Sequence, residues 1–178
     1  MAERTESTDP SPRHPGRPIH VTFVCTGNIC RSPIAEKVFA TRLAQAGLAD
    51  RVRVSSAGTG NWHVGAGADD RAAAVLHRHG YPTDHIAAQV DPDHLGATLV
   101  VALDTGHERA LLRMGVPSDR IRLLRSFDPD SDSADVADPY YGADAEFEVV
   151  LDQAEAAVPG LLAWVRDRLT ATVEPCEG

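Results

Sequence analysis

One cysteine and one arginine stand with five residues between them in a short stretch, VCTGNICRSP, that runs from Val24 to Pro33. They are Cys25 and Arg31. A thiolate within a ring of backbone N–H donors is a strong nucleophile, and a guanidinium can grip two phosphate oxygens with its planar fork. The pair therefore points to phosphoryl transfer through a phosphocysteine. The plain alternative is a structural cysteine beside an arginine that starts a helix.

The elements on either side of this stretch distinguish a phosphoryl-transfer site from a structural cysteine, because a phosphoryl-transfer site needs flanking elements that form an anion site. Residues 19–25 are mostly apolar and predict a buried strand, whereas residues 32–46 place their apolar side chains on one face of a helix that ends at Gly47. A loop between a strand and a helix N-terminus presents backbone N–H groups to an anion. Gly27 lets the backbone approach a ligand closely, and Pro33 suits a first helical turn. This arrangement favours phosphoryl transfer.

Strand and helix patterns alternate along the rest of the chain. We expect further strands over 51–57, 98–103 and 121–124, and the almost wholly apolar run at 98–103 is typical of a buried parallel strand. Helical patterns cover 69–79, 91–95, 105–114 and 147–169, with a restart at Pro159 left open. The alternation predicts a three-layer α/β sandwich with a central, mostly four-stranded parallel sheet flanked by helices. Ligands then bind at the carboxyl ends of the strands, where Cys25 lies.

Composition and length limit the other possibilities. The 178 residues suit one domain, which we place at 19–169 between an N-terminal tail, 1–18, of disordered composition and a C-terminal tail, 170–178. The net charge is −9, with no basic stripe and no apolar run of membrane-span length, so we expect neither nucleic acid nor a membrane as a partner. The start of the sequence lacks an apolar signal-peptide core, which makes the cytoplasm the default location and leaves open secretion that needs no signal peptide.

The cysteine pattern argues against a disulfide framework and against zinc. The chain has three cysteines, Cys25, Cys30 and Cys176, two of them in one loop. No Cys-x2-Cys pair, and no pair of histidines close to Cys25 and Cys30 in the sequence, supports a tetrahedral site. We therefore expect no metal and no cofactor.

Three motifs make the chain resemble a known family, the low-molecular-weight protein tyrosine phosphatases, and most closely its actinobacterial members. They are VCTGNICRSP, SSAGTGNWHVG from Ser55 and ADPYYG from Ala137. The resemblance covers about residues 19–169. It implies a phosphotyrosine phosphatase in which Cys25 is the nucleophile, Arg31 binds the phosphate and Asp138 is the general acid and base. An exposed turn within an acidic stretch is the alternative for Asp138.

The resemblance also assigns supporting roles. The phosphate-binding residues would be Thr26, Gly27, Asn28, Ile29, Cys30, Arg31 and Ser32. The walls of the substrate pocket would be Ile29, Trp62, Tyr140 and Tyr141. The network that holds the loop would be Asn28, Ser56 and His85. Ser32 would also hydrogen-bond the Cys25 sulfur or cap the helix, whereas an exposed loop position is the alternative for His85.

The expected partners follow from this activity. They are phosphotyrosine-containing proteins, opposed by a tyrosine kinase, and we expect the chain to act as a monomer. Cys30 lies close enough in sequence to Cys25 for the two to form a redox pair, with a buried structural thiol as the alternative.

Three competing functions use the same loop. An arsenate reductase needs two resolving cysteines downstream, and only Cys176 follows Cys30. A protein-arginine phosphatase is nearer, but that branch carries threonine where this chain has Ile29. A phospho-ligand binding module or redox sensor would not need Cys25, Arg31 and Asp138 together.

Overall fold

The computed structural model describes residues 17–172, and its centre is a four-stranded parallel sheet. The strands are β1 (Ile19–Cys25), β2 (Val52–Gly58), β3 (Leu99–Ala102) and β4 (Ile121–Leu123), in the order β2-β1-β3-β4. Every pairing is parallel. The expected strands and the parallel sheet are confirmed.

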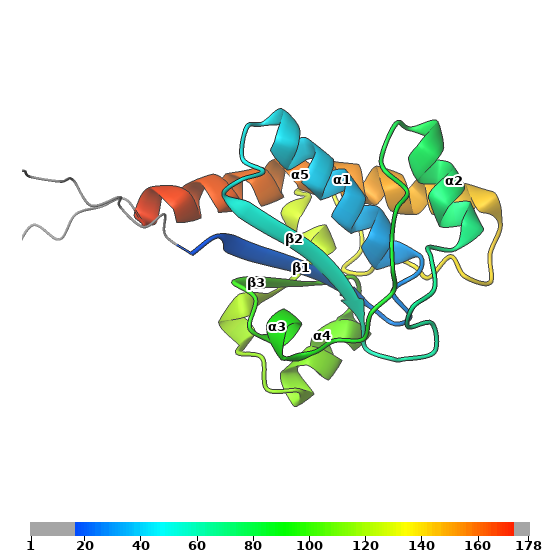
Figure 1. Cartoon of the computed structure of the whole chain (residues 1–178), viewed down its shortest axis with the longest axis horizontal. Coiled ribbons are helices and arrows are strands. Elements are labelled where there is room, and N and C mark those ends of the chain that lie inside the picture. Colours follow the sequence, from blue (N-terminus) through cyan, green and yellow to red (C-terminus); the bar gives the residue numbers. More distant parts are fainter. Residues whose placement is uncertain (1–16, 173–178) are drawn as a thin grey trace, which may run out of the picture.

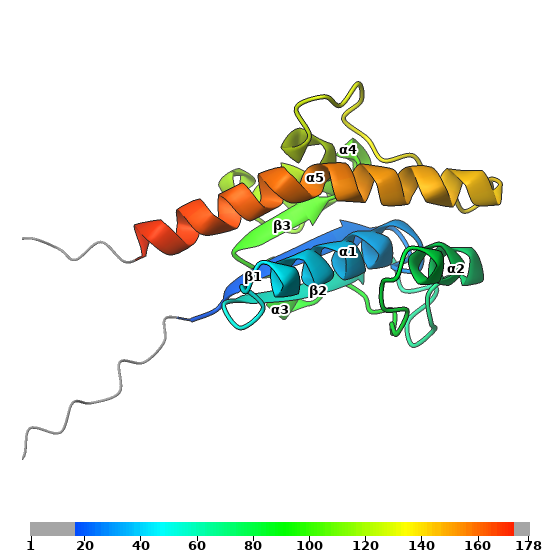
Figure 2. The same cartoon turned by 90° about the horizontal axis from the view of Figure 1, so that it is seen from above.

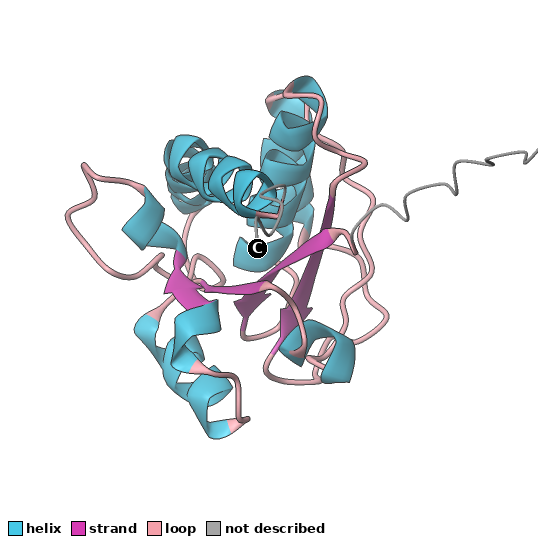
Figure 3. Cartoon of the chain, turned by 90° about the vertical axis from the view of Figure 1, so that its left-hand side faces the viewer, coloured by secondary structure: helices cyan, strands magenta, loops and turns pink. Residues whose placement is uncertain are grey.

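Helices cover both faces of this sheet. One face carries α1 (Arg31–Gln45), α2 (Asp70–Arg78) and α5 (Asp144–Ala171), and the other carries α3 (Pro92–Leu95) and α4 (Thr105–Arg113) (Figure 1). The view from the side, Figure 3, shows the same three layers. Two short 3-10 helices, η1 (Ser118–Arg120) and η2 (Leu124–Phe127), flank β4. The expected three-layer sandwich is confirmed.

Strand β1 is buried along its whole length, which explains its composition. Ile19, Val21 and Phe23 belong to the larger core under α1 and α5, where Phe23 meets Phe39 edge to face at 5.8 Å, and Val24 belongs to the smaller core on the other face. Its polar side chains are buried but hydrogen-bonded. Ser55 of β2 lies 2.7 Å from His20 Nε2 and donates to Thr22 Oγ1 at 2.9 Å.

Helix α5 is the longest element and runs alongside α1 across the sheet (Figure 2). It continues through Pro159 without a restart and buries Phe147, Leu151 and Leu161. Residues 170 and 171, which the sequence placed in the C-terminal tail, belong to this helix. Of the two expected tails, residues 1–16 and 173–178, with Cys176, lie outside the described part of the chain.

Within residues 17–172, no helix combines the length and the apolar character that a membrane span requires.

Candidate active site

The cysteine and the arginine stand at the junction of β1 and α1. Cys25 is the last residue of β1 and Arg31 is the first residue of α1. The loop between them rests directly on the end of β2: a Cβ atom on Gly58 would lie 2.6 Å from the Thr26 carbonyl oxygen. Thr59 and Gly60 donate backbone hydrogen bonds to the carbonyls of Cys25 and Thr26 at 2.9 and 3.0 Å. The end of the sheet therefore fixes the loop.

The Cys25 sulfur is buried and has a hydroxyl beside it. Ser32 Oγ lies 2.9 Å from Cys25 Sγ, and both side chains are buried. This is the contact that the sequence predicted for Ser32, and no side-chain hydrogen bond caps α1. A hydroxyl in this position can donate to a thiolate.

Asn28 holds the loop in shape through its backbone conformation and its side-chain hydrogen bonds. Its φ of 56° is the one positive value at a non-glycine residue within 17–172, a conformation that asparagine tolerates better than most. Its amide donates to Ser32 Oγ at 2.8 Å and to Ser56 Oγ at 2.9 Å, and its Oδ1 accepts the Ala88 N–H at 2.9 Å. The expected contact with Ser56 is present.

Two further residues complete this network. His85 Nε2 lies 2.7 Å from the Asn28 carbonyl, and its side chain is only 4% exposed, so the exposed alternative for His85 is wrong. Ser56 donates its hydroxyl hydrogen to the Glu36 carboxylate. Glu36 was not predicted from the sequence. Its position four residues after Ser32, on the same face of α1, is the signal that was available.

Arg31 is oriented by groups from two distant segments. Its Nη1 donates to Asp104 Oδ2 at 2.8 Å and to the Val136 carbonyl at 2.9 Å, which uses both hydrogens of that nitrogen. The other edge, Nε and Nη2, has weaker contacts: Nη2 lies 3.5 Å from Thr26 Oγ1 and 3.7 Å from Asp138 Oδ2. That edge is available to an oxyanion.

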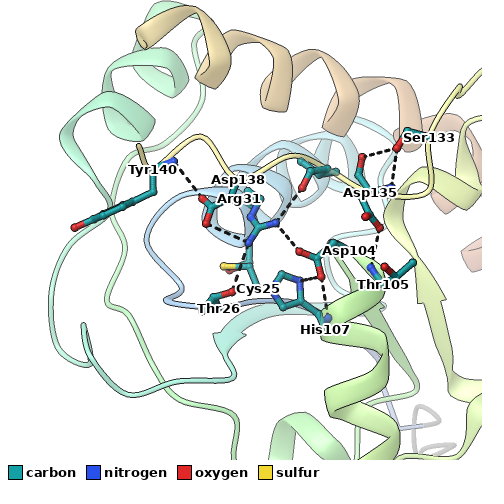
Figure 4. A network of polar contacts seen from close by, with 12 residues as sticks. Cys25, Thr26, Arg31, Asp104, Thr105, His107, Ser133, Asp135, Asp138 and Tyr140 are labelled. Atoms are coloured by element: carbon teal, nitrogen blue, oxygen red, sulfur yellow. Dashed lines mark hydrogen bonds and ion pairs between the residues drawn. The ribbon is translucent and has the colours of Figure 1, made fainter. Parts of the chain in front are cut away.

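Asp104 and His107, both missed by the sequence analysis, close a ring under the loop (Figure 4). Asp104 follows β3 at its carboxyl end and accepts the His107 backbone N–H at 2.8 Å, while His107 Nε2 lies 2.9 Å from Thr26 Oγ1. Burial, helped by the positive charge of Arg31, lowers the pKa of His107 to about 4, so its imidazole is neutral near pH 7. Burial alone would raise the pKa of Asp104, but hydrogen bonds from His107 and Arg31 hold it below its usual value. Arg31 therefore faces a carboxylate that is ionised at neutral pH.

A cavity of about 500 Å³ opens over the Cys25 sulfur. Its lining is Cys25, Thr26, Gly27, Ile29, Cys30, Arg31, Trp62, His63, Asp138, Tyr140 and Tyr141. All four expected wall residues are among them, and His63 is an addition. Asn28 and Ser32, which the sequence placed with the phosphate-binding residues, are absent from this lining.

The walls differ in exposure. Trp62 is 72% and Tyr141 94% exposed, so neither is a core residue, whereas Ile29 is buried at the base of the wall. Asp138 is half-exposed and accepts the Tyr140 N–H at 3.1 Å.

Cys30 is buried, and that burial, aided by the charge of Asp69, raises the pKa of its thiol to about 12. Within 17–172, no group of three or more histidine, cysteine, aspartate or glutamate side chains is arranged to hold a metal ion.

A family model described as low molecular weight phosphotyrosine protein phosphatase matches residues 20–171. The chain belongs to this family. It is 62% identical over 154 residues to low molecular weight protein-tyrosine phosphatase A of Mycobacterium tuberculosis, covering 85% of this chain and 94% of that protein. It is 53% identical over 156 residues to the corresponding phosphatase of Streptomyces coelicolor, covering 84% and 94%.

A solved structure agrees with this assignment. The crystal structure of YfkJ from Bacillus subtilis matches with a TM-score of 0.81 at 36% identity and covers 86% of this chain and 98% of that one. The resemblance to actinobacterial members is confirmed, and the chain is a protein-tyrosine-phosphatase of the low molecular weight family.

Proposed function

We propose that this phosphatase works through a phosphocysteine on Cys25, with Arg31 and the loop N–H groups binding the phosphate and Asp138 moving the proton. The observation that carries the proposal is the convergence of Cys25, Arg31 and Asp138 on one cavity. They come from the end of β1, the start of α1 and the loop before α5. Together they offer a nucleophile, an anion clamp and a proton donor.

The first half of the reaction forms the phosphocysteine. Cys25 Sγ attacks phosphorus while the free Nε and Nη2 edge of Arg31 binds two phosphate oxygens. Asp138 gives its proton to the oxygen of the leaving tyrosine as the phosphorus–oxygen bond breaks.

The second half returns the enzyme to its starting state. Asp138, now a carboxylate, takes a proton from water, whose oxygen attacks the phosphorus. The sulfur–phosphorus bond breaks, inorganic phosphate leaves, and the Ser32 hydroxyl stabilises the departing Cys25 thiolate.

The walls of the cavity support phosphotyrosine as the substrate. A phenyl ring reaching down to Cys25 would contact Ile29, and it would cover aromatic surface of Trp62 and Tyr140, each contact worth roughly 0.5–1.5 kcal/mol beyond area burial. Phosphoserine is too short to bring its phosphate to the buried Cys25 sulfur past these walls. Phosphoarginine is a planar cation, and Ile29 offers it no polar partner.

Matched peptides that carry phosphotyrosine, phosphoserine or phosphoarginine test this function. We expect kcat/KM to favour phosphotyrosine strongly and to be unchanged by a chelator. Cys25→Ser should abolish turnover while phosphate analogues still bind. Ile29→Thr should erode the discrimination against phosphoarginine. Equal or better cleavage of phosphoarginine by the unaltered protein would instead assign it as an arginine phosphatase, and residual turnover in pure Cys25→Ser would refute the phosphocysteine.

The cellular setting belongs to the same proposal. We infer a monomer in the cytoplasm that needs no metal or cofactor and acts on phosphotyrosine-containing proteins opposed by a tyrosine kinase. An arsenate reductase has less support, because Cys25 and Cys30 are the only cysteines within 17–172 and both are free thiols.

A further inference from the structure

The loop that carries Asp138 is fastened by an arginine that has no place in the reaction described above. We propose that Arg71, in the first turn of α2, is a positioning residue that fixes this loop over the phosphate loop and so sets the reach of Asp138. We name residues 138–142 the acid loop. The inference rests on the proposed role of Asp138.

The Arg71 side chain is itself held by two residues, Asp69 and Phe147. Its Nε and Nη2 donate to the two carboxylate oxygens of Asp69, each at 3.0 Å, and Asp69 caps α2 by accepting the Arg71 backbone N–H at 2.9 Å. The hydrogen bonds from Arg71 lower the pKa of Asp69, so the pair stays ionised at neutral pH. The guanidinium also lies over the Phe147 ring, 4.6 Å from its centroid. A planar fork fixed in this way has little freedom left.

The remaining donors of Arg71 point at the acid loop. Nη2 donates to the Tyr140 carbonyl at 2.9 Å and Nη1 donates to the Gly142 carbonyl at 3.0 Å. Among the described residues, these are the only hydrogen bonds that join the acid loop to another part of the molecule. Inside the loop, Asp138 accepts the Tyr140 N–H. A displacement of Tyr140 would therefore pull on Asp138, whose Oδ2 also lies 3.7 Å from Arg31 Nη2.

The same anchor also touches the opposite wall of the cavity. The backbone N–H of Asp69 donates to the Ile29 carbonyl at 2.8 Å. Asp69 and Arg71 thus tie the phosphate loop at Ile29 and the acid loop at Tyr140 to one helix end. The spacing between the two walls, and with it the position of Asp138 relative to the leaving oxygen, depends on Arg71.

Aryl phosphates whose leaving phenols differ in acidity can show whether Arg71 positions Asp138 or only stabilises the fold. Poor leaving groups need the proton from Asp138 and acidic phenols hardly need it. We expect Arg71→Ala to lower kcat/KM by roughly 10-fold or more for poor leaving groups, and much less for acidic ones. Arg71→Lys should restore part of the loss, because an ammonium can still donate to a carbonyl.

Arg78→Ala is the matched control. Arg78 lies on the same helix and also bridges to α5, where its Nε donates to Glu148 at 3.1 Å, but it does not touch the acid loop. In this variant, kcat/KM should depend on the acidity of the leaving phenol in the same way as in the unaltered enzyme. Thermal unfolding of both variants reports their stability separately.

Asp138→Asn makes the outcomes distinguishable. The inference is supported if kcat/KM of Asp138→Asn depends steeply on the acidity of the leaving phenol, and if adding Arg71→Ala to that variant lowers kcat/KM little further. An Arg71→Ala variant that loses kcat/KM equally for all leaving groups, or loses none, would overturn it while leaving the role of Asp138 intact. A flat dependence in Asp138→Asn itself would overturn the proposed general acid instead. If Arg71→Ala does not fold, the same criteria apply to Arg71→Lys.

Discussion

The two cysteines of the phosphate loop differ in what surrounds their sulfur atoms. Both cysteines are buried and line the cavity, but only Cys25 has the Ser32 hydroxyl 2.9 Å from its sulfur. Cys30 is buried, and its pKa is raised to about 12, so it remains a thiol at any physiological pH. An oxidant should therefore react with Cys25 first.

Cys30 lines the same cavity as Cys25, and we predict that it resolves that oxidation. Peroxide converts the Cys25 thiolate to a sulfenic acid, and the Cys30 thiol then displaces water to give a disulfide. We expect peptide mapping after mild peroxide to find Cys25 joined to Cys30, and dithiothreitol to restore activity. Recovery that is equally complete in Cys30→Ala would show that Cys30 does not protect Cys25.

Single residues were predictable where a local motif names them. Cys25, Arg31 and Asp138 each stand in a short characteristic stretch, and all three line one cavity. Asp104 was not predictable in this way, because its partner Arg31 lies 73 residues away and only the fold joins them. Arg71 has the same difficulty: its contacts with Tyr140 and Gly142 span 69 and 71 residues.

At the scale of elements, the periodicity of side chains located every strand to within a few residues, but it could not decide whether α5 continues through Pro159. Proline lacks the N–H of a normal helix turn, and its cost depends on what surrounds it. Here the next residue, Gly160, lies against η2, where a Cβ atom would come within 2.3 Å of the Phe127 carbonyl oxygen. The close approach of η2 needs a glycine, and sequence patterns do not reveal such contacts.

Gly160→Ala tests this packing. In an open helix the change gains about 1 kcal/mol, but overpacking against a backbone carbonyl costs roughly 1–3 kcal/mol. We therefore expect a net loss in the free energy of unfolding, measured by urea titration. A variant that is more stable than the unaltered protein would show that η2 can move away from the added methyl group at little cost.

At the scale of the whole molecule, the neutral histidine under the phosphate loop makes stability depend on pH. An unfolded histidine binds a proton near pH 6.5, whereas His107 resists protonation until about pH 4. Between these values the unfolded chain holds more protons, so the folded state loses stability as the pH falls. The loss from His107 amounts to roughly 3 kcal/mol by pH 4.

His107→Gln should flatten this dependence, since an amide can still contact Thr26 but does not titrate. The measurement is the free energy of unfolding in urea at several values between pH 7 and pH 4, compared as slopes rather than as absolute values. Burial and Arg53 also lower the pKa of His20, which keeps its contribution in both proteins. Parallel curves for the two proteins would rule out His107 as the source.

Gly58 packs against the phosphate loop, and this contact limits which amino acids can replace it during evolution. Its backbone angle is open to any amino acid, and space alone excludes a side chain, since the Thr26 carbonyl lies where a Cβ would go. Gly65 is the opposite case, with a φ of 86° and nothing within 4 Å of a Cβ. A lineage could replace Gly65 at a modest cost in backbone strain. It could replace Gly58 only if the backbone of the loop that follows Cys25 moved as well.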